Sequence, residues 1–154
     1  MRAVAFAVLA CVVALAGCGA GECPDATQLS AEIGLGDLDT GYQPMADGDN
    51  VMVVLGPQGL NMIVVSVRVD GLEQGEYHVT VEVDHDGDLV AGAVAYLEPE
   101  LSPPDLAAYF LGLRVVFTVD QVRPLDGQLA VVTATVTDAC GDPATATRNV
   151  HLNL

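Results

Sequence analysis

The chain contains no lysine, and only five cationic residues stand against 21 aspartates and glutamates, which gives a formal net charge of −16 at pH 7. A field of this sign repels phosphate backbones, which argues against nucleic acid as a partner. It also opposes electrostatic adhesion to anionic lipid, so attachment to a membrane would have to come from acyl chains. The acidity favours cationic partners or divalent cations; solubility near a crowded surface is the simpler explanation.

Residue patterns that carry catalysis are also missing. No serine lies in a glycine-framed nucleophile elbow, and no glycine-rich phosphate loop leads into a helix. The histidines His78, His85 and His151 are scattered along the chain. A blue-copper site would need a cysteine, a histidine and often a methionine close together near the C-terminus, and that cluster is not formed. The sequence therefore predicts a protein that is not an enzyme and has no resident cofactor.

Residues 1–17 have the form of an export signal. Met1 and Arg2 precede an apolar run over 3–16, which is shorter than the roughly 20 residues that span a bilayer. The run ends in Leu15-Ala16-Gly17-Cys18, which resembles the lipobox of bacterial lipoproteins. The resemblance implies cleavage before Cys18, diacylation of its sulfur and acylation of its new amino group. An ordinary secretory signal with a chance cysteine is the alternative.

The expected domain organisation follows from that cleavage. Residues 1–17 are a signal peptide that is removed, 18–28 are the lipidated N-terminus and tether, and 29–154 form one domain. Gly19 follows Cys18 where an aspartate would imply retention at the inner membrane. The lipoprotein resemblance thus implies a lipid-anchored protein of the bacterial cell envelope, at the outer membrane.

Two of the four cysteines are expected to remain available for a disulfide. Cys11 leaves with the signal, and the Cys18 sulfur is consumed by the thioether to lipid. Cys23 and Cys140 remain, an even number in an oxidising compartment, and we expect them to form a disulfide.

Alternation of apolar and polar residues dominates the rest of the chain. Tyr77, Val79, Val81 and Val83, for example, alternate with polar neighbours, which is typical of a strand with one buried face. Turn sequences rich in Asp, Gly and Pro separate such runs. The pattern predicts an all-β, immunoglobulin-like antiparallel β-sandwich of seven to nine strands. We expect strands near 29–35, 42–45, 50–55, 61–69, 75–83, 89–97, 111–119, 128–138 and 144–153.

The segment 98–110 breaks this pattern because its prolines cannot donate to a sheet ladder. Ser102 can cap a short helix that has Pro103 at its first position and continues through Leu106 to Phe110. We expect one helical turn here, in a crossover between the two sheets.

The run Asp84-His85-Asp86-Gly87-Asp88 places three carboxylates at alternate positions beside a glycine. Asp84, Asp86 and Asp88 are thus a weak candidate for a calcium site, although the order differs from that of an EF-hand loop. A hairpin turn between the flanking strands is the simpler interpretation, because Asp and Gly are preferred there.

Two stretches resemble known families. The run from Val136 to Thr147 is similar to the final hairpin of bacterial immunoglobulin-like domains. The stretch from Gly34 to Asp49, together with Leu55-Gly56-Pro57-Gln58-Gly59, resembles uncharacterised putative lipoproteins of myxobacteria. In those proteins Gly-Pro-Gln-Gly is followed by Gly and His, whereas this chain has Leu60 and Asn61. The resemblance implies a fold and a cellular location, but no activity.

These observations predict a membrane-anchored lipoprotein that acts as a non-catalytic binding or structural module of the envelope. Its expected partners are the membrane, through the lipid, and an envelope protein or surface polymer. The loops over 98–110 and Asp84–Asp88 are the expected contact regions. The alternative is a calcium-binding envelope protein that uses the Asp84–Asp88 turn.

Overall fold

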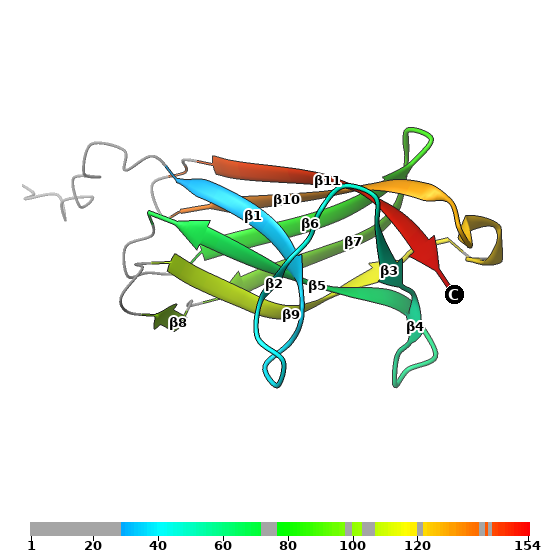
Figure 1. Ribbon diagram of the computed structural model, residues 1–154, viewed down its shortest axis with the longest axis horizontal. Coiled ribbons are helices and arrows are strands. Elements are labelled where there is room, and N and C mark those ends of the chain that lie inside the picture. Colours follow the sequence, from blue (N-terminus) through cyan, green and yellow to red (C-terminus); the bar gives the residue numbers. More distant parts are fainter. Residues whose placement is uncertain are drawn as a thin grey trace, which may run out of the picture.

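The computed structural model describes residues 29–71, 77–97, 100–102, 107–119, 122–138, 141 and 143–154. They form strands and one short 3-10 helix, η1 (Figure 1). No helix within these ranges is both long and apolar enough to cross a membrane. The strands are β1 (Ser30–Leu35), β2 (Gln43–Pro44), β3 (Asp49–Met52), β4 (Val54–Leu55), β5 (Asn61–Asp70), β6 (Tyr77–His85), β7 (Asp88–Leu97), β8 (Glu100–Ser102), β9 (Ala107–Phe117), β10 (Leu129–Thr137) and β11 (Pro143–Asn153), with η1 at Arg123–Leu125.

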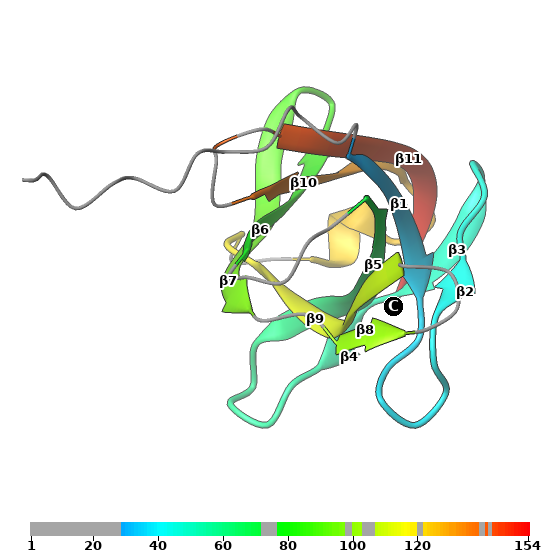
Figure 2. The ribbon, with the colours of Figure 1, turned by 90° about the vertical axis from the view of Figure 1, so that its left-hand side faces the viewer.

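Hydrogen bonds link the strands in the order β2-β1-β5-β9-β7-β6-β10-β11-β3, with β4 added to β5 and β8 to β9. The path curls into two layers, which Figure 2 shows end-on. One layer is β1, β5 and β9, and the other is β7, β6, β10, β11 and β3. Only two register pairs, Ala91↔Phe117 and Gly92↔Val116, join β7 to β9 at the corner.

This arrangement confirms the predicted all-β immunoglobulin-like sandwich. Strands β1, β5 and β9 correspond to A, B and E of such a domain, and β6, β10 and β11 to C, F and G. All pairs between the described strands are antiparallel except β11 with β3, which run parallel. The core lies between the layers, because every second side chain of each long strand points inward. Inward residues with at most 1% exposure include Ile63, Val65, Val67, Val69, Val79, Val81, Val83, Val132, Ala134 and Val136.

Met45 joins β1 and β11, the strands next to the two edges of the curled sheet. Its backbone N–H donates to the carbonyl of Ile33 in β1 (3.2 Å), and its carbonyl accepts from Nε of Arg148 in β11 (2.8 Å). The Met45 side chain is 3% exposed and belongs to the core. The seam between β1 and β11 is therefore closed by a residue that lies between β2 and β3.

The helical turn predicted over Leu106 to Phe110 is wrong, because Ala107 to Phe110 are the start of β9. Ala108 and Phe110 pair with Val69 and Val67 of β5, and both point into the core. Burial at a period of two overrides the local helix-capping signal. The short helical turn is η1 instead, with a proline in its first turn.

The strand count also differs from the expected seven to nine. The predicted strand 50–55 is divided into β3 and β4, because the Val53 N–H donates to Asn153 rather than to β5. Strand β8, whose three residues pair with β9, was not predicted.

Candidate contact face

Two hairpin loops project from the same side of the β1–β5–β9 layer. Figures 1 and 2 show the β1–β2 loop and the β4–β5 loop both pointing away from the sandwich on this side. We call this surface the hairpin face. It consists of loop 36–42, loop 56–60 with its flanking Leu55, and the outward side chains of Met62, Arg114 and Val116.

The first loop is built around one carboxylate. Oδ1 of Asp37 accepts hydrogen bonds from the backbone N–H of Asp39 (3.0 Å) and from the N–H and Oγ1 of Thr40 (both 2.9 Å). The N–H of Gly41 donates to the Asp37 carbonyl at 2.8 Å. These bonds, first that from the Thr40 backbone, lower the pKa of Asp37 below its ordinary value.

The bonded turn leaves an apolar side chain at its tip. Leu38 is 83% exposed, the highest value among the exposed large apolar residues of the described chain. A tip fixed by its own hydrogen bonds loses little conformational entropy when it meets a partner. Leu38 is therefore presented on a pre-organised support.

The loop is also fastened to the sheet beneath it. The Ser66 hydroxyl donates to the carbonyl of Gly36 (2.9 Å) and accepts from the N–H of Gly112 (3.1 Å). Ser66 is fully buried and lies at a β-bulge between β5 and β9. Gly112 has φ +69°, a conformation that favours glycine, and a Cβ there would lie 3.7 Å from Cβ of Asp37. The bulge thus provides both the donor and the close approach that hold loop 36–42.

The second loop is a tight turn. The N–H of Gly59 donates to the carbonyl of Gly56 at 2.9 Å, and the N–H of Gly56 donates to the carbonyl of Leu60 at 2.8 Å. Pro57 is at the second position of this turn, which its fixed φ suits. Leu55 is 71% exposed and Leu60 is 47% exposed. This loop, like the first, holds large apolar side chains in water.

A hollow of about 360 Å³ lies on the hairpin face. Arg114 is its one cationic lining residue. It is exposed, and it forms no hydrogen bond or ion pair with another described residue. In so acidic a chain, an arginine without an ion-pair partner beside apolar side chains is a distinct chemical feature. The lining residues are Gly56, Pro57, Gln58, Leu60, Met62, Arg114 and Val116.

A second arginine of the same layer is paired with carboxylates. Arg68 forms ion pairs with Glu32 of β1 (3.2 Å) and with Asp70 of its own strand (2.8 Å). The ring of Tyr109, its register partner, lies 5.6 Å from that of Tyr42. Burial raises the pKa of Tyr42, whose hydroxyl has no hydrogen-bond partner among the described residues. This cluster fastens β1 to β5, and it leaves Arg114 as the cation available at the hairpin face.

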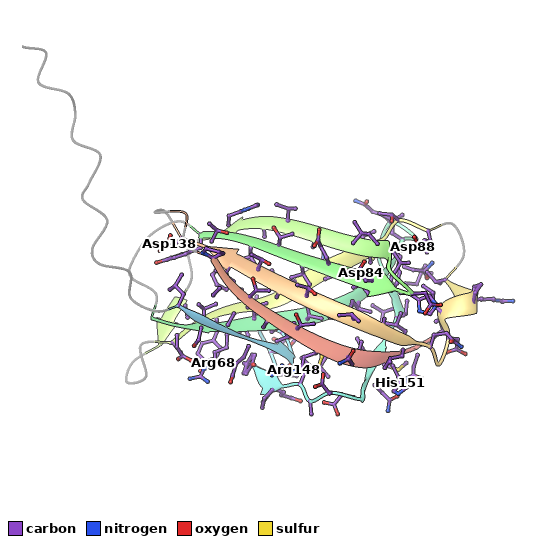
Figure 3. The ribbon with its side chains drawn as sticks, turned by 90° about the horizontal axis from the view of Figure 1, so that it is seen from above. Arg68, Asp84, Asp88, Asp138, Arg148 and His151 are labelled. Atoms are coloured by element: carbon purple, nitrogen blue, oxygen red, sulfur yellow. The ribbon has the colours of Figure 1, made fainter. Side chains whose placement is uncertain are left out.

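The acidic run 84–88 is a hairpin turn. Asp86 and Gly87 both have positive φ, 53° and 88°, which is the type I′ geometry that Asp-Gly favours. Asp84 and Asp88 lie on the two flanking strands, toward the opposite end of the sandwich from Arg68 (Figure 3). His85 approaches Asp86 (Nε2 to Oδ2, 3.5 Å) and the carbonyl of Leu129 (Nδ1, 3.0 Å).

No group of three His, Cys, Asp or Glu side chains in the described ranges could hold a metal ion. The hairpin interpretation of Asp84, Asp86 and Asp88 therefore accounts for their geometry, and calcium binding by them stays a prediction.

Other predicted site residues fall outside the described ranges. They are Cys18, Cys23 and Cys140, and most of the stretch between Leu97 and Ala107. Lipidation, the disulfide and the role of that loop stay predictions. His78 and His151 are half-buried on their strands, and Nδ1 of His151 lies 3.4 Å from the carbonyl of Gly127.

Sequence reasoning missed the hairpin face. The available signal was a leucine between two aspartates in a turn sequence, Asp37-Leu38-Asp39-Thr40, where a polar tip is ordinary. A second signal was the apolar flanks of Gly-Pro-Gln-Gly, Leu55 and Leu60. That both loops project from one side depends on the bulge at Ser66 and on sheet pairing, which the local sequence does not reveal.

No family model matches the chain, and no curated protein matches it. Among solved structures, the CooA pilin subunit from enterotoxigenic Escherichia coli has 10% identity and a TM-score of 0.37, covering 80% of this chain and 98% of that chain. The N-terminal domain of PorA has 14% identity and a TM-score of 0.34, covering 80% and 97%. An engineered protein has 23% identity and a TM-score of 0.40; 82% of this chain matches 20% of its length. Likenesses this weak carry no inference about activity or partner.

Proposed function

We propose that the protein is a lipid-anchored, non-catalytic contact module of the bacterial cell envelope. Cys18 attaches it to the outer membrane, and the hairpin face binds an envelope protein or surface polymer. The observation that carries the proposal is the pair of rigid loops that hold Leu38, Leu55 and Leu60 in water on one side of the sandwich. Grouped exposed apolar side chains on a soluble domain typically mark an interaction surface.

The position of β1 supports the tether. The chain from Cys18 to Ser30 can span at most about 40 Å when fully extended. Strand β1 begins at one end of the long axis of the sandwich, whereas the two loops project sideways from it (Figure 1). A domain held by this end keeps the hairpin face accessible to a partner beside it.

The positions of the strand ends support the proposed disulfide. Strand β10 ends at Thr137 and β11 begins at Pro143, so Cys140 belongs to the connection between them. The end of β10, the start of β11 and the start of β1 lie at the same end of the sandwich (Figure 1). Cys23 precedes Ser30 by seven residues along the chain. A Cys23–Cys140 disulfide would fix the tether to the last hairpin.

Lipid attachment can be tested directly in bacterial cells fed an alkyne-labelled fatty acid. The native chain should carry the label and fractionate with the outer membrane, and Cys18→Ser should lose both properties. Cys140→Ser is the matched control, because it removes a cysteine without touching the lipobox. A native chain that is unlabelled and freely soluble would contradict the anchor.

The contact role can be tested with a photocrosslinking amino acid in place of Leu55, in the full chain in intact cells. Irradiation should give a discrete adduct with an envelope component. Placing the same amino acid at Leu129, which is 51% exposed on the other layer, is the matched control. Equal adducts from both positions, or none from position 55, would contradict a specific hairpin face.

A further inference from the structure

The hairpin face carries a projection and a hollow side by side. The projection is the tip Asp37–Thr40, with Leu38 at its end and an aspartate on each side. The hollow is lined mainly by apolar residues, among them Leu60, Met62 and Val116, and by Arg114. They are neighbours, because Gly112, which lies against Asp37, precedes Arg114 by two residues in β9.

Charge and shape are complementary between these two features. An apolar tip that bears carboxylates matches an apolar hollow that bears a guanidinium. The Asp37 carboxylate is consumed by its own turn, whereas the exposed Asp39 uses only its backbone N–H there. Asp39 is thus the carboxylate available for Arg114. The two side chains form no ion pair within one molecule.

A second copy of the chain supplies both features in the required relation. In a two-fold arrangement, each copy presents the same patch, so one contact is repeated by symmetry. An axis that passes between the tip and the hollow places each Leu38 in the hollow of the other copy and each Asp39 beside the other Arg114. Both tips and both hollows are then occupied, and the assembly closes at two.

The acidity of the chain restricts where two copies can associate. A net charge of −16 opposes self-association over most of the surface. Arg68 and Arg148 are committed within the fold, to carboxylates and to backbone carbonyls respectively. Arg114 has no such partner within the described part of the chain, and it lies where an acidic tip of a second copy can reach it. Electrostatic complementarity at one place selects the orientation of two otherwise repelling copies.

We propose that the protein forms a symmetric homodimer through the hairpin face, with Leu38 in the partner's hollow and Asp39 paired with the partner's Arg114. The two loops and the hollow provide fewer residues a side than the roughly 20–30 of a standard-sized interface, so the contact is a small one. Attachment of both copies to one membrane raises their effective concentration and favours such a contact. This inference names a partner for the proposed contact module and rests on that proposal.

The test uses the full chain in intact cells, with a photocrosslinking amino acid in place of Leu38. We expect an adduct of twice the monomer mass, cross-linked to a peptide that contains residues 56–62. Arg114→Glu should reduce this adduct at least tenfold, and so should Asp39→Arg. The double variant with both changes should restore it, because the ion pair is remade with its charges exchanged.

Arg123→Glu is the matched control, because Arg123 is an exposed arginine of η1 that lies off the hairpin face. It should leave the adduct unchanged. Thermal unfolding of each variant shows that loss of the adduct does not reflect loss of the fold. An adduct with a different protein would overturn self-association while leaving the contact module intact. No adduct from Leu38, or a double variant that stays monomeric, would also overturn the dimer.

Discussion

The two acidic hairpin loops of this domain, 36–42 and 84–88, look alike in sequence but are built in different ways. In 84–88 the backbone makes the turn: Asp86 and Gly87 adopt positive φ, and the Asp86 carboxylate has only His85 beside it, with no bond to the backbone of the turn. In 36–42 a side chain makes the turn, because Asp37 accepts three hydrogen bonds from the residues after it. The first construction leaves charge at the tip, and the second leaves an exposed leucine there. An aspartate in a turn can therefore either leave its charge exposed or hold the turn together by accepting hydrogen bonds.

The largest expected effect is on the hairpin whose turn depends on the backbone. Gly87→Ala forces an L side chain into φ 88° and should destabilise the domain by about 1–2 kcal/mol. Chemical denaturation measures this change. Gly92→Ala is the matched control: a Cβ there meets only the Val81 carbonyl oxygen, at 3.8 Å, so stability should be unchanged or slightly higher. Equal effects at the two glycines would show that the turn geometry is not what matters at Gly87.

The hairpin whose turn depends on a side chain should respond to loss of that side chain. Asp37→Ala removes the acceptor for the Thr40 N–H, and hydrogen exchange of that amide should become faster by at least tenfold. Asp86→Asn is the comparison, because asparagine tolerates positive φ and nothing in that turn bonds to the carboxylate except nearby His85. It should leave exchange in its own hairpin nearly unchanged. If both variants behaved alike, the distinction between the two loops would be lost.

Acid should weaken the Asp37 turn in a predictable direction. The folded-state pKa of Asp37 is lowered, so its contribution is fully present above the ordinary value of 3.8 and is lost as the pH falls through the lowered pKa. The NMR amide shift of Thr40 should therefore titrate below pH 3.8 with the Asp37 carboxylate. A midpoint at or above 3.8 would show that the carboxylate gains nothing from these bonds.

The smallest effect is expected from calcium. If Asp84, Asp86 and Asp88 serve only a hairpin, isothermal titration of the full chain with calcium should give no saturable heat. Asp86→Asn should then behave as the native chain does. A saturable heat that disappears in Asp86→Asn would instead support the calcium-binding alternative.

Much of the fold was predictable because its information is local. The alternation from Tyr77 to Val83 gives β6, and the Asp-Gly pair at 86–87 gives its hairpin. The start of β9 was not predictable in this way. Ser102 and Pro103 signal a helix, whereas Ala108 and Phe110 are set by pairing with β5 and burial in the core. The free energy of capping a helix is smaller than that of burying a phenylalanine side chain. Burial of Phe110 and pairing with β5 therefore decide the conformation of this segment.

The hairpin face was less predictable for a related reason. Loop 36–42 and β9 are far apart in the sequence, and they meet because Ser66 and Gly112 form a bulge that receives the loop. Exposure of an apolar residue is also a property of the fold rather than of the sequence. Leu38 and Leu35 are both leucines near β1, yet only Leu38 stands clear of the surface.

The bond pair at Met45 has a mechanical consequence. A pull applied on the N-terminal side of the domain reaches the sandwich at Ser30, so β1 is the first strand to bear the load. The Met45 N–H holds β1 at Ile33, and its carbonyl holds Arg148 of β11. Force on the first strand is therefore transmitted to the last one as well as to β5. Both layers of the sandwich therefore share a force that is applied to β1.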